Sequence, residues 1–165
     1  MAEPSTLDLR KTVRLARDEA RVLGSARIEA EHLLLALAAQ PQLPAGRLLW
    51  GEGLRPDAIR DALDLEFAHS LGAIGISLHG FALPDTRLPF LGSLPLGRSA
   101  KLALQRTIWA RSGRGRDRRR PDSLHLLIGI LDARSGTVAR ALTLSGFDRD
   151  ALAERARREL QERAA

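Results

Sequence analysis

The chain of 165 residues has no cysteine, no tyrosine and few other aromatic side chains. Without cysteine it can form no disulfide framework, thiolate zinc site or cysteine nucleophile, and nothing points to an oxidising compartment. The scarcity of aromatic rings argues against a base-stacking platform for nucleic acid. The longest unbroken apolar run, 33–39, is too short to span a membrane, and the first residues lack a signal-peptide pattern. We therefore expect a cytoplasmic protein with no membrane partner.

What the chain does contain is typical of one soluble globular domain. Apolar residues make up 44% and charged residues 28%, values that exclude wholesale disorder and fibrous repeats. The net charge is +6, and most of the positive excess lies in the second half of the chain. Its main source is a short run of arginines, Arg111, Arg114, Arg116, Arg118, Arg119 and Arg120.

Apolar residues recur at helical spacing through most of the chain. The pattern predicts helices over 9–23, 31–39, 45–50, 56–67, 98–111, 123–132, 137–144 and 148–163. Between 70 and 97, glycines and prolines alternate, which predicts a linker. Apolar side chains are scattered through this linker, so we expect it to lie against the folded body. A short strand pair near Ile74–Leu78 is a further prediction.

The most informative feature is an internal repeat at an offset of 93 residues. His32 and the leucines after it align with His125 and the apolar residues after it, and Gly53 aligns with Gly146. Each copy alone would expose an apolar face, so the two should pack together. The predicted fold is all-α, with two tandem four-helix repeats in one pseudo-twofold domain over 1–165. Repeat one spans 7–69, the linker 70–97 and repeat two 97–163.

Two stretches of the first repeat, LARDEARVLG at 15–24 and IEAEHLLLAL at 28–37, resemble the Clp N-terminal domain. This domain, also called the Clp R or double Clp-N motif, begins the AAA+ unfoldases of the ClpA, ClpB and ClpC types. Its fold is two four-helix repeats in tandem, in agreement with the repeat found above. The second repeat resembles the family more weakly, because it keeps His125 but has Leu124 where the family has a glutamate.

The resemblance implies a binding function without catalysis. In that family the N domain binds substrates and adaptors and delivers them to ATPase rings. We therefore expect a non-enzymatic protein- and peptide-binding module of the Clp proteolysis system, without cofactor or metal. It would bind substrates, adaptors or peptide-like toxins, including cyclic peptides, as an accessory or decoy of a ClpC-type unfoldase.

The chain contains no Gly-x-x-x-x-Gly-Lys-Ser/Thr phosphate loop, so it cannot hydrolyse ATP by that route. A free-standing Clp-N-like protein is the interpretation we favour. The alternatives are an N-terminal fragment of a full AAA+ unfoldase and a nucleic-acid-associated protein that acts through Arg111–Arg120.

The resemblance also indicates a candidate binding site at Glu31. In some ClpC-type proteins the corresponding glutamate helps to receive phosphorylated arginine, and a carboxylate suits a guanidinium. Here Ala30 replaces the family threonine beside it, and Leu124 replaces the second glutamate. The alternative is that Glu31 only favours the positive end of its helix. By analogy with the family's peptide groove, Phe81 and Phe90 of the linker are candidate lining residues.

The remaining chemistry-bearing residues have structural interpretations. We expect His32 and His125 to be imidazoles hydrogen-bonded at helix starts, and Trp50 and Trp109 to be core anchors. The arginine run is expected to be a solvated loop, a docking element for an acidic partner, or a contact to nucleic acid. The acidic residues after Pro56 are expected to form a solvated face, namely Asp57, Asp61, Asp64 and Glu66.

Overall fold

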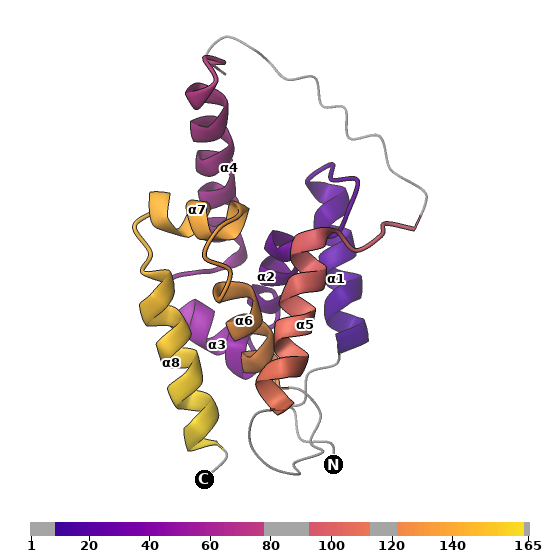
Figure 1. Ribbon diagram of the computed structural model, residues 1–165, viewed down its shortest axis with the longest axis vertical. Coiled ribbons are helices and arrows are strands. Elements are labelled where there is room, and N and C mark those ends of the chain that lie inside the picture. The colour runs from indigo at the N-terminus through magenta and orange to yellow at the C-terminus, as the bar shows by residue number, and fades with distance from the viewer. Residues whose placement is uncertain (1–8, 78–92, 113–121, 164–165) are drawn as a thin grey trace.

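The computed structural model describes residues 9–77, 93–112 and 122–163, with side chains omitted for 109–112. The described residues form eight helices and one isolated bridge, between Ile28 and Leu96, so the all-α prediction is confirmed. The helices, shown in Figure 1, are α1 (Leu9–Val22), α2 (Ala30–Ala38), α3 (Pro44–Gly51), α4 (Pro56–Ala73), α5 (Arg98–Ser112), α6 (Ser123–Leu131), α7 (Thr137–Leu144) and α8 (Arg149–Glu162).

The helices show the repeat directly. α6, α7 and α8 each begin 93 residues after α2, α3 and α4, at 123, 137 and 149 against 30, 44 and 56. The turns match as well, because Gly53 after α3 and Gly146 after α7 have the same positive φ of 78°. Glycine adopts this left-handed conformation without strain, and so both helices end in the same way.

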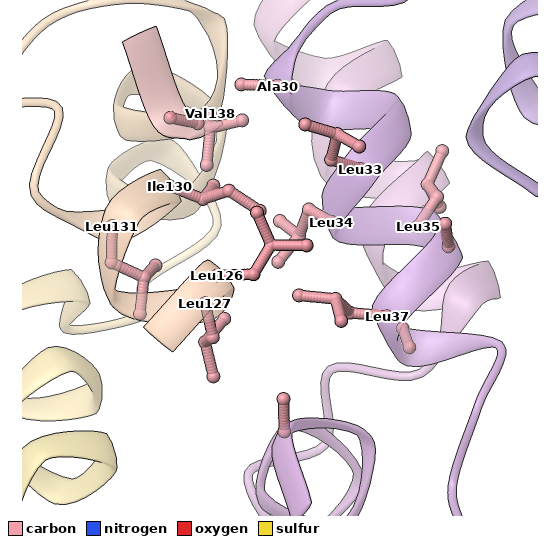
Figure 2. Packing of buried hydrophobic residues seen from close by; sticks show 14 of the residues in the cluster. Ala30, Leu33, Leu34, Leu35, Leu37, Leu126, Leu127, Ile130, Leu131 and Val138 are labelled. Carbon is pink, nitrogen blue, oxygen red and sulfur yellow. The ribbon is translucent and has the colours of Figure 1, made fainter. Parts of the chain in front are cut away.

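The two repeats share one core built around α2 and α6. Figure 2 shows Leu34 of α2 and Leu126 of α6 pointing toward one another, and both are buried. Every residue of α2 except Glu31 is buried, so this helix is covered on nearly all sides. The leucine-rich pattern reflects that position, since a helix packed from all sides is apolar all round.

A clasp made by the residues before α5 ties the second repeat to the first. The Ile28 N–H donates to the Pro95 carbonyl (2.9 Å), and the Gly97 N–H donates back to the Ile28 carbonyl (2.8 Å). A Cβ at Gly97 would overlap the Glu29 carboxylate, so a larger residue there would displace that side chain from Ser99. The N-terminus of α5 is thereby held beside the N-terminus of α2.

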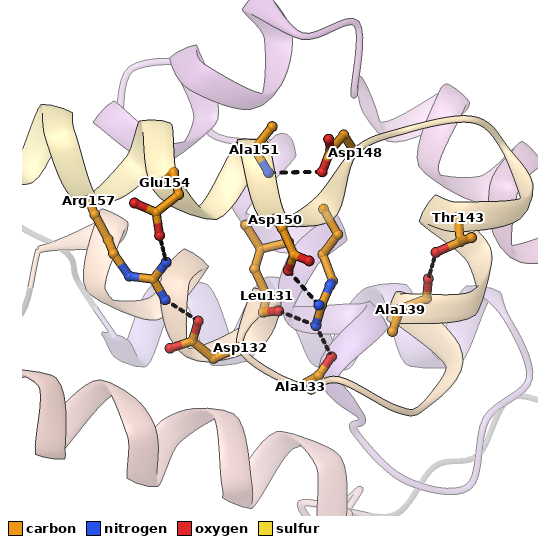
Figure 3. Close-up of polar contacts among 11 residues, drawn as sticks. Leu131, Asp132, Ala133, Ala139, Thr143, Asp148, Asp150, Ala151, Glu154 and Arg157 are labelled. Atoms are coloured by element: carbon orange, nitrogen blue, oxygen red, sulfur yellow. Dashed lines mark hydrogen bonds and ion pairs between the residues drawn. The ribbon is translucent and has the colours of Figure 1, made fainter.

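Polar contacts fix α8 on the end of α6, as Figure 3 shows. Arg149 donates to the carbonyls of Leu131, the last residue of α6 (2.9 Å), and of Ala133, two residues later (2.7 Å). Arg157 contacts Asp132 and Glu154. The carbonyls at the end of α6 are thus partly satisfied by Arg149 of α8.

Two local predictions are corrected by the structure. The strand pair near Ile74–Leu78 is wrong over 74–77, because α4 continues to Ala73 and then turns at Gly75, whose φ is +80°. The linker consequently does not begin at residue 70. The apolar residues there continue the stripe of α4, and the last turn of a helix tolerates a glycine such as Gly72. Leu78 itself lies outside the described residues.

Candidate functional site

A groove of about 460 Å³ opens between the two repeats, at the N-terminus of α2. One wall comes from α5, and the other comes from the end of α6 and the start of α7. Its size lies within the range of pockets that hold a small ligand or one long side chain. The lining residues used below are Glu29, Ala30, Glu31, Arg98, Leu102, Arg106, Arg134, Gly136 and Thr137.

Glu31 is the acidic group of the groove that lacks a partner side chain. It is half-buried, and no other side chain among the described residues hydrogen-bonds or ion-pairs with it. Burial raises the pKa of Glu31 above its ordinary value, and a hydrogen bond from its own backbone N–H partly offsets that effect. A carboxylate that has lost hydration without gaining a cation favours a cationic ligand group.

The carboxylate of Glu29, two residues earlier, already has hydrogen-bond partners within the chain. Its Oε2 accepts from the Ser99 N–H (3.0 Å) and the Ser99 hydroxyl (2.5 Å), and the Ser99 Oγ in turn accepts from the Ala30 N–H (2.8 Å). Each helix start therefore caps the other. The arrangement holds the α5 wall of the groove at a fixed distance from Glu31 and uses the first N–H of α2 internally.

Three arginines give the groove a basic rim. Arg106 donates to the Gly129 carbonyl (3.3 Å). Arg98 and Arg134 are exposed, and neither makes a hydrogen bond or ion pair with any described residue. The groove thus places one desolvated carboxylate below two available guanidinium groups.

The start of α7 adds a second feature for an anion. Its N-cap is Gly136, with φ of +120°, and no side chain caps the helix there. The first N–H groups of a helix attract anions when nothing else satisfies them. The sequence analysis missed Arg98, Arg134 and this helix start, because all three come from the other repeat. The only signal for them was the 93-residue offset, which places Gly136 at the position of Leu43 and Thr137 at that of Pro44.

His32 lies just below the groove and is buried. Its Nδ1 accepts from the Glu29 N–H (2.8 Å), so the neutral ring carries its proton on Nε2. Burial lowers the pKa of His32 to about 4, against a smaller opposing effect of the Glu29 charge. In the second repeat the Nδ1 of His125 accepts from the Asp122 N–H (3.3 Å) in the same way. The structure thus places both imidazoles at helix starts.

The matching position in the second repeat is filled by the protein itself. Leu124, the counterpart of Glu31, is fully buried. Ser123 is also fully buried, and its Oγ accepts from the Ala45 N–H (3.1 Å) at the start of α3. Leu43 and Pro44 are buried too, whereas their counterparts Gly136 and Thr137 line the groove.

One residue predicted to lie on a solvated acidic face does not. Asp57, Asp61 and Asp64 are exposed, but Glu66 is buried at 5% exposure. Its carboxylate accepts from the Ser70 hydroxyl (2.6 Å) and from Nε of Arg140 in α7 (2.7 Å). Burial alone would raise the pKa of Glu66, but these hydrogen bonds and the Arg140 charge lower it. Glu66 thus connects the two repeats.

Several predicted residues lie outside the described residues, among them Phe81 and Phe90, the arginines from Arg114 to Arg120, and the side chains of Trp109 and Arg111. The backbone of Arg111 belongs to α5. Trp50, predicted as a core anchor, is 38% exposed, and its Nε1 donates to the Ala38 carbonyl (2.7 Å) while Arg55 covers the ring.

No cluster of three or more histidine, aspartate or glutamate side chains among the described residues could hold a metal ion. None of the described helices has the length and apolar character needed to cross a bilayer.

Two matches with known proteins bear on the fold. Residues 5–73 match the family described as Clp repeat (R) N-terminal domain. The fold is similar to the crystal structure of the N-terminal domain of the caseinolytic protease associated chaperone ClpD from Arabidopsis thaliana. That match has a TM-score of 0.65 and 21% sequence identity, and covers 98% of this chain and 97% of the other. Comparison with curated proteins gives no match.

These findings agree with the repeat, the helix order and the position of the signature at the start of α2. The sequence pattern accounts for the first half of the chain, and the fold accounts for both halves. The first repeat therefore matches the Clp repeat N-terminal domain family, and the chain as a whole has the fold of a Clp N-terminal domain.

Proposed function

We propose that the chain is a non-enzymatic binding module that captures a cationic side chain of a peptide or protein in the groove at Glu31. The supporting observation is the half-buried Glu31 carboxylate, which has no partner side chain among the described residues. A guanidinium fits this site, because it forms paired, charge-assisted hydrogen bonds with a carboxylate.

The rim of the groove supports a more specific ligand, phosphorylated arginine. A phosphate on the guanidinium would lie toward Arg98 and Arg134, whose side chains are available, and toward the uncapped start of α7. The start of α2 is a poorer phosphate site, because Ser99 takes the Ala30 N–H and the Glu31 carboxylate takes its own N–H. The loss of the family threonine at Ala30 therefore removes little from this site.

This proposal includes the system in which the module acts. A Clp N domain that binds arginine-marked peptides would serve as an accessory or a decoy of a ClpC-type unfoldase, competing for or passing on its substrates and adaptors. It would act by binding alone, in the cytoplasm.

The test is a titration of the full chain with phosphoarginine, with an arginine-rich peptide and with a ClpC-type unfoldase, measured by calorimetry. Wild type should bind phosphoarginine, and Glu31→Ala should abolish binding. A matched control is Glu52→Ala, which removes a carboxylate that pairs with Arg155 away from the groove. Absence of binding to all three probes, or unchanged affinity in Glu31→Ala, would refute the proposal.

A further inference from the structure

The outer face of α1 carries a stripe of four arginines, Arg10, Arg14, Arg17 and Arg21. They follow one another at i, i+4, i+7 and i+11, so they share one face of the helix over about 16 Å. The opposite face, with Thr12, Ala16 and Ala20, is buried against the core. The arginine stripe is thus turned away from the body, and it lies apart from the groove.

Three of the four arginines lack a partner among the residues that the structure describes. Arg10, Arg14 and Arg17 make no hydrogen bond or ion pair with any described residue, and the Nε of Arg17 is buried without an acceptor. Arg21 contacts Asp18 at 3.4 Å on the surface. The other acid of α1 is Glu19. Both of its carboxylate oxygens accept from Nη2 of Arg60 in α4, at 2.9 and 2.7 Å.

Local stability does not explain this arrangement. Like charges three or four residues apart on a helix repel one another. Arg10 also stands in the first turn of α1, where the helix dipole disfavours a cation, and the described residues of that turn include no acid. A helix that keeps like charges together on one exposed face, at a cost in local stability, indicates a surface completed by another molecule.

We propose that the arginine stripe of α1 is a docking surface for an acidic helical segment of a partner protein, with carboxylates at the same i, i+4, i+7 and i+11 spacing. Guanidinium groups match carboxylates in paired, charge-assisted geometry, and a row of carboxylates would offset the positive charge of the stripe. Nucleic acid fits less well, because Asp18 flanks the stripe and α1 carries no aromatic side chain for stacking.

A second copy of the chain is a weaker fit. Asp57, Asp61 and Asp64 of α4 do have the i, i+4, i+7 spacing. However, exposed ion pairs alone contribute little, and two chains of net charge +6 repel.

The test uses the full chain and two fluorescent synthetic peptides of about 18 residues, long enough to form a helix. One peptide carries four glutamates on one helical face, and the other carries them spread around the helix. Fluorescence anisotropy should show that wild type prefers the one-face peptide. Arg14→Gln combined with Arg17→Gln should weaken that binding about tenfold, while thermal stability stays unchanged or rises.

The charge-matched control is Arg47→Gln combined with Arg158→Gln, which removes two exposed, unpartnered arginines of α3 and α8. It should leave the affinity unchanged, as should Glu31→Gln in the groove. Equal binding of both peptides, or an equal loss in the control, would overturn the proposal. So would tighter binding of a DNA duplex that depends on Arg14 and Arg17, or self-association by sedimentation that the stripe variant abolishes.

Discussion

The two repeats differ at the same helix start, which lines a groove in the first repeat and is buried in the second. At the start of α2, Glu31 lines an open groove whose other wall begins at the uncapped Gly136 of α7. At the start of α6, Leu124 is fully buried, and Ser123 caps the start of α3 through the Ala45 N–H. The same helix start therefore lines an open groove in one repeat and belongs to the core in the other, and the two differ in the side chain at the second helical position.

The comparison predicts one site for a cationic group rather than two. Binding a cationic group needs a carboxylate with space before it, and the second repeat has neither. Leucine at position 124 makes the second repeat more stable than glutamate would, because a buried apolar side chain avoids the cost of desolvating an unpaired carboxylate. The predictions below exchange or perturb matching positions in the two repeats, in order of decreasing effect.

The largest effect is expected for Leu124→Glu, which gives the second repeat the residue of the first. The carboxylate would be buried without a cation, at a cost of about 3–5 kcal/mol in unfolding free energy. Urea unfolding followed by circular dichroism measures this. A loss below about 1 kcal/mol, or a gain of a second phosphoarginine site, would mean that the second helix start is not filled as described.

The next effect concerns acid pH and His32. Its pKa is about 4 in the folded chain and higher when unfolded, so the folded state binds fewer protons between these values. Stability is fully present above about pH 6.5 and falls as the pH drops toward 4, by about 3 kcal/mol at most. The raised pKa of Glu31 acts in the opposite sense, because the folded state then takes up a proton more readily.

The variant His32→Gln isolates this contribution, since an amide oxygen can accept from the Glu29 N–H without titrating. Its stability should depend less steeply on pH between 6.5 and 4 than that of wild type. An NMR titration of the His32 ring should show a midpoint near pH 4. Parallel stability curves for the two proteins, or a midpoint near 6.5, would contradict the burial effect.

A third contrast lies at matched positions inside α2 and α6, Ala36 and Gly129. A Cβ at Gly129 would lie 2.5 Å from the Ala103 carbonyl and 2.8 Å from the Thr107 hydroxyl. Gly129→Ala should therefore destabilise by about 1–3 kcal/mol through overpacking against α5. Ala36→Gly should cost about 1 kcal/mol through helix propensity. Thermal unfolding of both variants measures the difference, and a stabilised Gly129→Ala would show that α5 can move away.

The smallest effect on stability is expected for Glu31→Gln. Removing a desolvated, unpaired charge should change the unfolding free energy by less than about 1 kcal/mol, toward greater stability. The same change should abolish phosphoarginine binding, so stability and binding separate in one variant. A marked loss of stability would instead indicate that Glu31 has a structural partner.

The sequence alone was sufficient to predict the helices, but it was not sufficient to predict the groove. Helical periodicity and the 93-residue offset predicted all eight helices and the all-α repeat fold. Periodicity can be recognised within one or two helical turns, and the offset can be recognised by aligning the sequence with itself. The prediction was wrong at the end of α4. Gly72 and Gly75 suggested a linker from residue 70, but the helix continues to Ala73.

The site illustrates the same limit. Glu31 was found from its place in the signature, but Arg98, Arg134 and the α7 start reach it only through packing of one repeat on the other. Glu66 was misassigned for a similar reason. Its spacing places it near three exposed aspartates, yet Arg140, 74 residues later, draws it into the interface between α4 and α7.

The most direct test of the account is the number of phosphoarginine molecules bound per chain, measured by isothermal titration calorimetry. The filled start of α6 and the open start of α2 predict one site per chain, lost entirely in Glu31→Gln. Two sites per chain, or one site that survives in Glu31→Gln, would contradict the assignment of the open groove as the binding site.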